Sequence, residues 1–338
     1  MGLDSLHLSR RAQVSILLAA LTWGNAWGQT NPAPPGKLID LGGYRLHLNC
    51  TGQGGPTVVL SSGAGDFSFD WALVQPEISK SNRVCSYDRS GEAWSDLGPK
   101  PRSMDQEVFD LARMLAAGGE RGPYILVGQS LGGMIARIFA DRYPQDVAGL
   151  VLVDAFSEDA RLFMSGQLVR VRETAKAASI PAPRDSITAD DRPSADEKAS
   201  IKEFMDKFVG QPKIESPFDK LPLAAQRYRL WALAQPSHYA AGDDYMAEIA
   251  ARIYTQTNAT HHPLRDLPLI VLQRTIDEYP SEQAAMLSKE HREQQQRLAA
   301  LSSKGHLISV PNSRHHIQID QPAAVVNAIR SVASRSGH

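Results

Sequence analysis

The sequence predicts an α/β protein in which a doubly wound, mostly parallel sheet of eight strands carries an inserted helical cap. Short apolar runs such as Thr57–Ser61 and Tyr124–Val127 lack polar alternation, as expected for strands that are covered on both faces. Helical patterns lie between these runs, which implies parallel crossover connections. The alternation stops between Phe156 and His262, where prolines divide a mostly helical pattern into short pieces.

The strands and helices follow one another in a simple order. The expected strands are Lys37–Leu41, Tyr44–Cys50, Thr57–Ser61, Arg83–Tyr87, Tyr124–Val127, Leu150–Val153, Leu269–Leu272 and His306–Val310. The first two are joined at Gly42-Gly43 and should form an antiparallel hairpin. The expected helices are Asp105–Ala117, Leu131–Arg142, Ser281–Leu301 and Pro322–Ala333. We therefore expect a core domain of residues 37–155 and 263–338, with the cap at 156–262.

The first residues have the pattern of a secretory signal peptide. The positive pair Arg10-Arg11 precedes the apolar run Val14–Leu21, and Ala26-Trp27-Gly28 offers small residues at the cleavage positions. This run is too short to cross a bilayer, which needs about 20 residues. We expect residues 1–28 to be removed, residues 29–36 to form an exposed leader, and the product to be periplasmic or secreted without a membrane span.

Charge and cysteine content narrow the functional classes. The chain of 338 residues has a formal net charge of −1, so it offers no strongly basic field to a nucleic acid. Its two cysteines, Cys50 and Cys85, lie on two expected strands. An oxidising compartment would permit a disulfide between them, and two buried thiols are the alternative. The sequence spacing leaves both open.

The strongest chemical signal is Gly128-Gln129-Ser130-Leu131-Gly132-Gly133, between an expected strand and an expected helix. This is the nucleophile-elbow pattern in its required strand–turn–helix context. The tight turn presents Ser130 at the end of the strand, and the glycines leave room for the neighbouring backbone. The helix that follows directs its first amide groups at the place where an oxyanion would form.

From this motif the chain, over about Lys37 to Ala333, resembles the α/β-hydrolase fold superfamily and its serine esterase-like members. Ser62-Gly63-Ala64 resembles the loop that supplies the first oxyanion donor, although many relatives carry a histidine where this chain has Ser62. The resemblance implies an oxyanion hole at Gly63, formed by the backbone N–H groups of Ala64 and Leu131. Tyr87-Asp88-Arg89-Ser90-Gly91 resembles a structural turn of the family. We expect Glu92, which follows it, to be exposed on the surface, and a place facing the substrate entrance is the alternative.

The same resemblance assigns the base. Ser313-Arg314-His315-His316-Ile317 and the residues up to Pro322 match the histidine loop after the last strand, with His315 in the histidine position. An imidazole suits this role because its unperturbed pKa lies near neutrality.

Two aspartates are candidates for the acid that orients the base. Asp154 follows the strand Leu150–Val153, and the chain resembles a subgroup with the sequence VLVD at that place. Asp277 follows the strand Leu269–Leu272, where Arg274 replaces the glycine usual in loops that carry the acid. This fold supplies the acid from either strand end, and the sequence leaves both open.

The resemblance implies hydrolysis of a carboxylic ester or related acyl bond of a small molecule, through a Ser–His–Asp triad and an acyl-enzyme. An amidase, peptidase or lactonase would use the same triad, and a non-catalytic ligand-binding homologue is the alternative outside enzymes. We expect no cofactor and no metal, since the chain has no dinucleotide fingerprint and no metal-ligand spacing.

Overall fold

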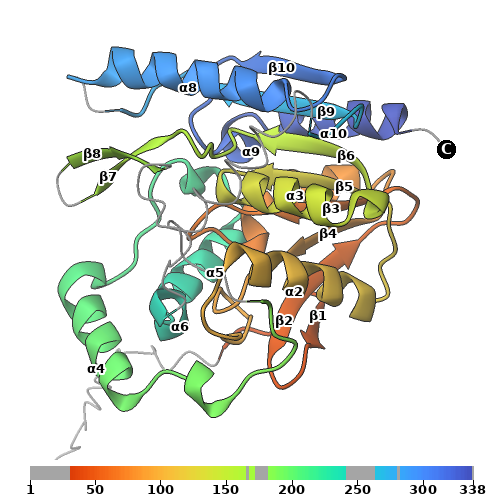
Figure 1. The fold of residues 1–338 in the computed structure, drawn as a ribbon. Coiled ribbons are helices and arrows are strands. Elements are labelled where there is room, and N and C mark those ends of the chain that lie inside the picture. Colours follow the sequence, from red (N-terminus) through yellow and green to blue (C-terminus); the bar gives the residue numbers. More distant parts are fainter. Residues whose placement is uncertain (1–30, 165–166, 172–181, 241–262, 280–281, 337–338) are drawn as a thin grey trace, which may run out of the picture. The chain divides into compact units, whose positions relative to one another are not determined.

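One mixed sheet of eight strands, in the order β1-β2-β4-β3-β5-β6-β9-β10, organises the protein (Figure 1). The computed structural model describes residues 31–164, 167–171, 182–240, 263–279 and 282–336, so the expected signal peptide lies outside the described residues. Residues 34–338 form one unit, to which all the elements below belong.

The expected strands and helices of the core are present. The strands are β1 (Lys37–Asp40), β2 (Arg45–Thr51), β3 (Thr57–Ser61), β4 (Val84–Tyr87), β5 (Tyr124–Gln129), β6 (Val147–Val153), β9 (Leu269–Arg274) and β10 (Gly305–Val310). The helices are α1 (Gln75–Ile78), α2 (Met104–Ala117), α3 (Leu131–Arg142), α8 (Ala284–Ala299), α9 (Ile317–Asp320) and α10 (Pro322–Arg335). Strand β2 runs antiparallel to β1 and β4, whereas the remaining neighbours are parallel. The predicted fold class is confirmed.

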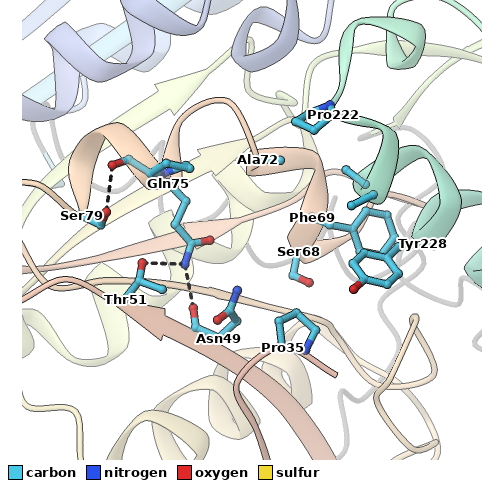
Figure 2. A pocket seen from close by; sticks show the side chains of 13 residues that line it. Pro35, Asn49, Thr51, Ser68, Phe69, Ala72, Gln75, Ser79, Pro222 and Tyr228 are labelled. Atoms are coloured by element: carbon cyan, nitrogen blue, oxygen red, sulfur yellow. Dashed lines mark hydrogen bonds between the residues drawn. The ribbon is translucent and has the colours of Figure 1, made fainter. Parts of the chain in front are cut away.

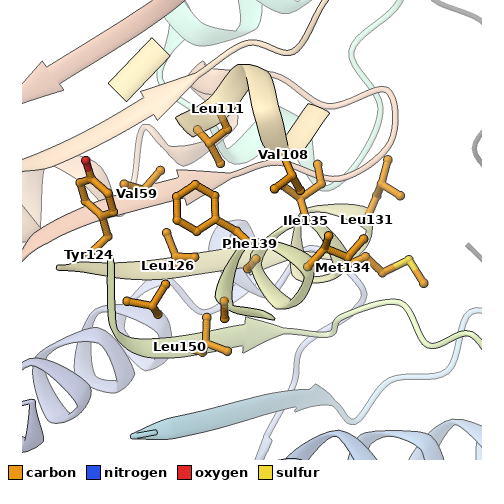
Figure 3. Packing of buried hydrophobic residues seen from close by; sticks show 14 of the residues in the cluster. Val59, Val108, Leu111, Tyr124, Leu126, Leu131, Met134, Ile135, Phe139 and Leu150 are labelled. Carbon is orange, nitrogen blue, oxygen red and sulfur yellow. The ribbon is translucent and has the colours of Figure 1, made fainter. Parts of the chain in front are cut away.

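Alternate residues of the central strands face two separate hydrophobic layers. Leu126 and Leu150 pack with α2, α3 and α8, and Figure 3 shows Phe139 and Ile135 of α3 within this layer. Ile125 and its neighbours on the opposite face pack with α1 and α10. Because both faces are covered by helices, the strands carry continuous apolar runs.

The segment 156–262, hereafter the cap segment, carries a hairpin as well as helices in the part that the structure describes. It contains the hairpin β7 (Arg161–Met164) and β8 (Gln167–Arg170), which the helical pattern did not predict. Its other described elements are η4 (Ala189–Asp191), α4 (Ala195–Phe204), η5 (Met205–Val209), η6 (Phe218–Lys220), α5 (Leu223–Leu233) and α6 (Pro236–Ala240). Trp231 and Leu221 of this segment pack against Trp94 and against Phe69 of the core helix η1 (Ser68–Trp71). Helix α5 therefore lies against the segments that follow β3 and β4.

A disulfide joins Cys50 of β2 to Cys85 of β4, two residues that stand opposite each other in the register. The structure therefore decides between the two alternatives in favour of a bond. No helix among the described residues is long and apolar enough to span a bilayer.

Candidate active site

Ser130 occupies a sharp turn between β5 and α3, with φ 50° and ψ −117°. Close packing explains the flanking glycines. A Cβ on Gly128 would lie 2.2 Å from the carbonyl oxygen of Gly132, and one on Gly132 would lie 2.2 Å from the carbonyl oxygen of Ser61. Larger residues at either position would therefore displace the backbone that presents Ser130.

The loop after β3 lies beside this serine. A Cβ on Gly63 would lie only 3.2 Å from Cβ of Ser130. Arg89 donates from Nη1 to the carbonyl oxygen of Ser62 at 2.7 Å and from Nη2 to that of Gly63 at 2.6 Å. Because a trans peptide points its N–H opposite to its C=O, the bond to Gly63 directs the N–H of Ala64 away from Arg89. Arg89 thus supports this loop, in which the histidine of many relatives is absent.

Ser62 itself has a structural place in the loop. Its hydroxyl donates to the carbonyl oxygen of Phe67 at 2.8 Å and accepts from the indole Nε1 of Trp71 at 2.9 Å. The backbone N–H of Leu131 lies at the start of α3, whose first amide groups have no partner within the helix. Gly63, Ala64 and Leu131 are therefore on the two segments that flank Ser130.

His315 and Asp154 are in direct contact. Nδ1 of His315 lies 2.7 Å from Oδ2 of Asp154, and the imidazole is about one third exposed while the carboxylate is fully buried. Gln129, the neighbour of Ser130, donates from Nε2 to the carbonyl oxygen of His315 at 3.4 Å. Ser130 follows β5, Asp154 follows β6 and His315 follows β10, so these residues share the carboxyl edge of the sheet.

Asp154 accepts from more groups than the sequence indicated. Besides His315, it accepts from His291 Nε2 of α8 at 2.9 Å, from the backbone N–H of Arg274 at 3.1 Å and from Arg274 Nη1 at 2.5 Å. Burial alone would raise the pKa of Asp154, but the hydrogen bonds from the two histidines and the charge of Arg274 hold it well below its usual range. This carboxylate is therefore ionised throughout the neutral range.

Asp277 lies elsewhere. Its side chain is exposed on the loop that follows β9, and the Nδ1 bond of His315 goes to Asp154. Arg274, which the sequence showed in place of the family's glycine, ends β9 and bonds to Asp154 with its backbone N–H and its guanidinium. The contact of His291 with Asp154 had no signal in the sequence, because α8 carries no motif around it.

A second histidine–aspartate pair lies next to the first. Nε2 of His316 is 3.0 Å from Oδ2 of Asp66, a residue of the loop beside Ser130. Arg229 of α5 donates to Asp66 at 3.2 Å and to Asp70 of η1 at 2.5 Å. Its guanidinium also stacks 3.3 Å from the ring centre of Phe218. This buried cluster joins the cap segment to the two loops of the site.

The two carboxylates of this cluster differ in charge state. Burial alone would raise the pKa of Asp66, but the charges of His316, Arg229 and His315 lower it to about 2. Burial raises the pKa of Asp70 to about 7, against the opposing charge of Arg229. Asp66 is therefore the ionised partner at neutral pH, whereas Asp70 is partly protonated there.

The expectation that Glu92 is exposed was wrong. Its residue exposure is 7%, and its Oε2 lies 2.6 Å from Nδ1 of His238 in α6. This contact forms a second link between the core and the cap segment. Local sequence gave no sign of it because the partner is supplied by a distant helix.

A cavity of about 340 Å³ opens between β2, η1, α1 and α5 (Figure 2). Gln75 at its polar end donates to the carbonyl oxygen of Asn49 at 2.9 Å and to Oγ1 of Thr51 at 3.3 Å. Ser130, His315 and Asp154 do not line it. The cavity is therefore separate from the residues at the carboxyl edge.

Comparisons with known proteins agree with this fold. Residues 58–328 match the family model described as "Alpha/beta hydrolase family". A thermophilic esterase from Thermogutta terrifontis superimposes with a TM-score of 0.58 at 21% identity, covering 87% of this chain and 95% of that one. The meta-cleavage product hydrolase CumD from Pseudomonas fluorescens IP01 gives 0.57 at 19% identity, covering 90% and 99%.

One of the curated relatives is the 2-hydroxymuconate semialdehyde hydrolase of Pseudomonas sp. (strain CF600). It is 36% identical over 121 residues, which cover 35% of this chain and 42% of that protein. Across the curated relatives, the matched part of this chain covers between 18% and 51% of the relative's own length.

Proposed function

We propose that this chain, which belongs to the alpha/beta hydrolase family, is a serine hydrolase that cleaves a carboxylic ester or a related acyl bond of a small molecule. In this proposal Ser130 is the nucleophile, His315 the base and Asp154 the acid. The observation that carries it is the 2.7 Å contact of His315 with the buried Asp154, at the sheet edge where Ser130 follows β5.

The reaction would proceed in two halves. His315 accepts the proton of Ser130 as the hydroxyl attacks the carbonyl carbon, and the resulting imidazolium is stabilised by Asp154. The tetrahedral oxyanion receives hydrogen bonds from the N–H groups of Ala64 and Leu131, each typically worth about 3 kcal/mol in the barrier. His315 then gives its proton to the leaving alcohol, and an acyl-enzyme remains. Water attacks the acyl group with His315 again as base and releases the acid.

Two features of the described residues support this chemistry. The nucleophile position holds a serine, whose acyl-enzyme water can resolve. The Arg89 contacts fix the carbonyl groups of residues 62 and 63, so that the oxyanion loop is held before substrate arrives. A donor already held in place needs no reorganisation during the reaction.

The test is covalent labelling and turnover of the full chain. A fluorophosphonate probe should label wild-type protein and leave Ser130→Ala unlabelled. In parallel, p-nitrophenyl esters of increasing acyl length should be hydrolysed by the wild type and not by the variant. Labelling of Ser130 without ester turnover would move the substrate to amides, lactones or bulkier esters. No labelling of folded protein would contradict the proposal and favour a ligand-binding homologue.

We also propose that the chain is exported, with cleavage after Gly28. The positive pair, the short apolar run and the small residues before Gln29 support this, as does a disulfide between strands of the core. Mass spectrometry of the protein expressed in a bacterium with its full N-terminus should find Gln29 as the first residue. An intact N-terminus on protein in the cytoplasmic fraction would contradict the proposal.

A further inference from the structure

Asp154 is held by an arginine that also lies close to the base. Nη1 of Arg274 is 2.5 Å from Oδ2 of Asp154 and 3.5 Å from Nδ1 of His315. The same carboxylate oxygen therefore faces both a guanidinium and the imidazole. A triad needs only the imidazole contact, so the arginine calls for a separate explanation.

Arg274 is itself firmly placed. It is the last residue of β9, its side chain is 8% exposed, and its own backbone N–H donates to Oδ1 of Asp154. The ring of Tyr279 lies against the guanidinium, with its centre 5.0 Å away. The side chain and the backbone N–H of Arg274 thus bond to the two oxygens of the Asp154 carboxylate. These bonds fix the orientation of the carboxylate toward His315.

We propose that Arg274 is a positioning residue of this site, whose guanidinium fixes the Asp154 carboxylate and places a permanent positive charge beside His315, extending the working range of the base toward lower pH. The inference rests on the proposed function, since it concerns how His315 serves Ser130. Arg274 touches no reacting atom, and its effect reaches the reaction through Asp154 and the imidazole.

The physical argument is electrostatic. His315 is active as a base only when neutral, and a cation within about 4–6 Å of an imidazole disfavours its protonated form. Arginine keeps its charge at every working pH, and its pKa here is raised further despite burial, chiefly by the charge of Asp154. Asp154 alone would stabilise the protonated form of His315. The positive charge of Arg274 offsets part of that stabilisation.

Other titratable groups also lie near His315. Glu278 accepts from the backbone N–H of His315 at 2.8 Å, and Asp66 lies beyond His316, to which it is bonded. His291 shares Asp154 from α8, on the oxygen that His315 does not contact. Glu278 and Asp66 are anions and would stabilise the imidazolium. Arg274 is the permanent cation that contacts the imidazole among the described residues.

The experiment measures the rate of fluorophosphonate labelling of the full chain from about pH 5 to about pH 8, where an imidazole titrates. Labelling requires the neutral base but no natural substrate. The variants are Arg274→Gln, which removes the charge, and Arg274→Lys, which keeps it. Arg297→Gln on α8 is the matched control, because it also removes one positive charge but from a side chain that is 53% exposed.

In Arg274→Gln the acidic limb of the labelling profile should move to higher pH by about one unit. At a given pH on that limb, labelling should then be about tenfold slower than in the wild type. Arg274→Lys and Arg297→Gln should keep the wild-type limb. If Arg274 only supports the fold, Arg274→Gln would slow labelling equally at every pH, and the proposal would be wrong.

Two further measurements keep the outcomes separate. Thermal unfolding shows whether each variant is folded, and Arg274→Met, an uncharged side chain of similar length that can pack against the ring of Tyr279, replaces Arg274→Gln if the latter does not fold. An unshifted limb in a folded, uncharged variant overturns the role of Arg274 while leaving the triad intact. A wild-type protein that is not labelled at any pH instead contradicts the proposed function.

Discussion

At the scale of single residues, the site contains neighbouring aspartates whose surroundings give them different charge states. Asp66 and Asp70 both contact Arg229, yet the pKa of Asp66 is lowered to about 2 and that of Asp70 is raised to about 7. Oδ1 of Asp70 is buried without a hydrogen-bond partner, which a protonated carboxyl tolerates better than an ionised one. The guanidinium of Arg229 therefore pairs with a full negative charge on Asp66 and a partial one on Asp70.

This difference predicts unequal effects of two matched substitutions. Asp66→Asn should lower the free energy of unfolding at neutral pH by about 3 kcal/mol, because it leaves the buried Arg229 and His316 without their ionised partner. Asp70→Asn should cost less than about 1 kcal/mol, because an amide resembles the protonated carboxyl. Urea unfolding of both variants measures the difference. Equal losses would show that the two carboxylates carry the same charge.

At the scale of elements, side chains of two neighbouring helices of the cap segment make buried polar contacts with the core. Arg229 of α5 bonds to Asp66 and Asp70, and His238 of α6 bonds to Glu92. Aromatic packing of Trp231 and Tyr228 on Trp94 supports the same region. The polar contacts fix the orientation of helices that the apolar packing alone would hold less specifically.

A double-mutant cycle tests the contact between Glu92 and His238. Glu92→Gln and His238→Gln each remove one partner of a nearly buried pair, so the double variant should lose less stability than the two single losses combined. We expect a coupling of about 1 kcal/mol in urea unfolding. The exposed pair Lys80–Glu77 on the surface is the matched control and should show no measurable coupling. Equal coupling in both cycles would contradict a buried link.

The core elements were predictable from sequence because their signals are local. The apolar runs of β3, β5 and β6 and the motif around Ser130 each lie within one short stretch. The hairpin β7–β8 was missed because Arg161 and Arg170, which lie on its two strands, both pair with Glu290 of α8, far along the chain. The contacts of His291 and Arg229 could not be predicted for the same reason, because their partners lie on other elements. Ser130 and His315 could be proposed from motifs, whereas the proposal of Asp154 rather than Asp277 as the acid rests on the contact of Asp154 with His315.

At the scale of the whole molecule, buried carboxylates give stability a definite dependence on pH. The pKa values of Asp154 and Asp66 are lowered in the folded state, so their contribution is present above about pH 4 and is lost as the pH falls through the folded values. Burial raises the pKa of Asp70 to about 7 and that of Asp110 to about 6. Stability associated with these two groups is present below about pH 4 and is lost as the pH rises through 6 and 7.

The free energy of unfolding should therefore be highest on the acidic side of neutrality, and decline both toward lower pH and toward pH 7. Urea unfolding at a series of pH values measures this profile. Asp70→Asn should flatten the decline between about pH 5 and pH 7, because it removes one of the two groups responsible. A wild-type profile that rises steadily up to pH 7 would show that Asp70 and Asp110 are ionised in the folded protein.

The identity of the acid is the most direct test of the proposed triad. We would measure kcat/KM of Asp154→Asn and Asp277→Asn with the best p-nitrophenyl ester, after confirming by thermal unfolding that both variants are folded. Asp154→Asn should lose about four orders of magnitude, as expected when the imidazole loses its orienting carboxylate, and Asp277→Asn should stay near wild type. A large loss at Asp277 with little loss at Asp154 would contradict the account.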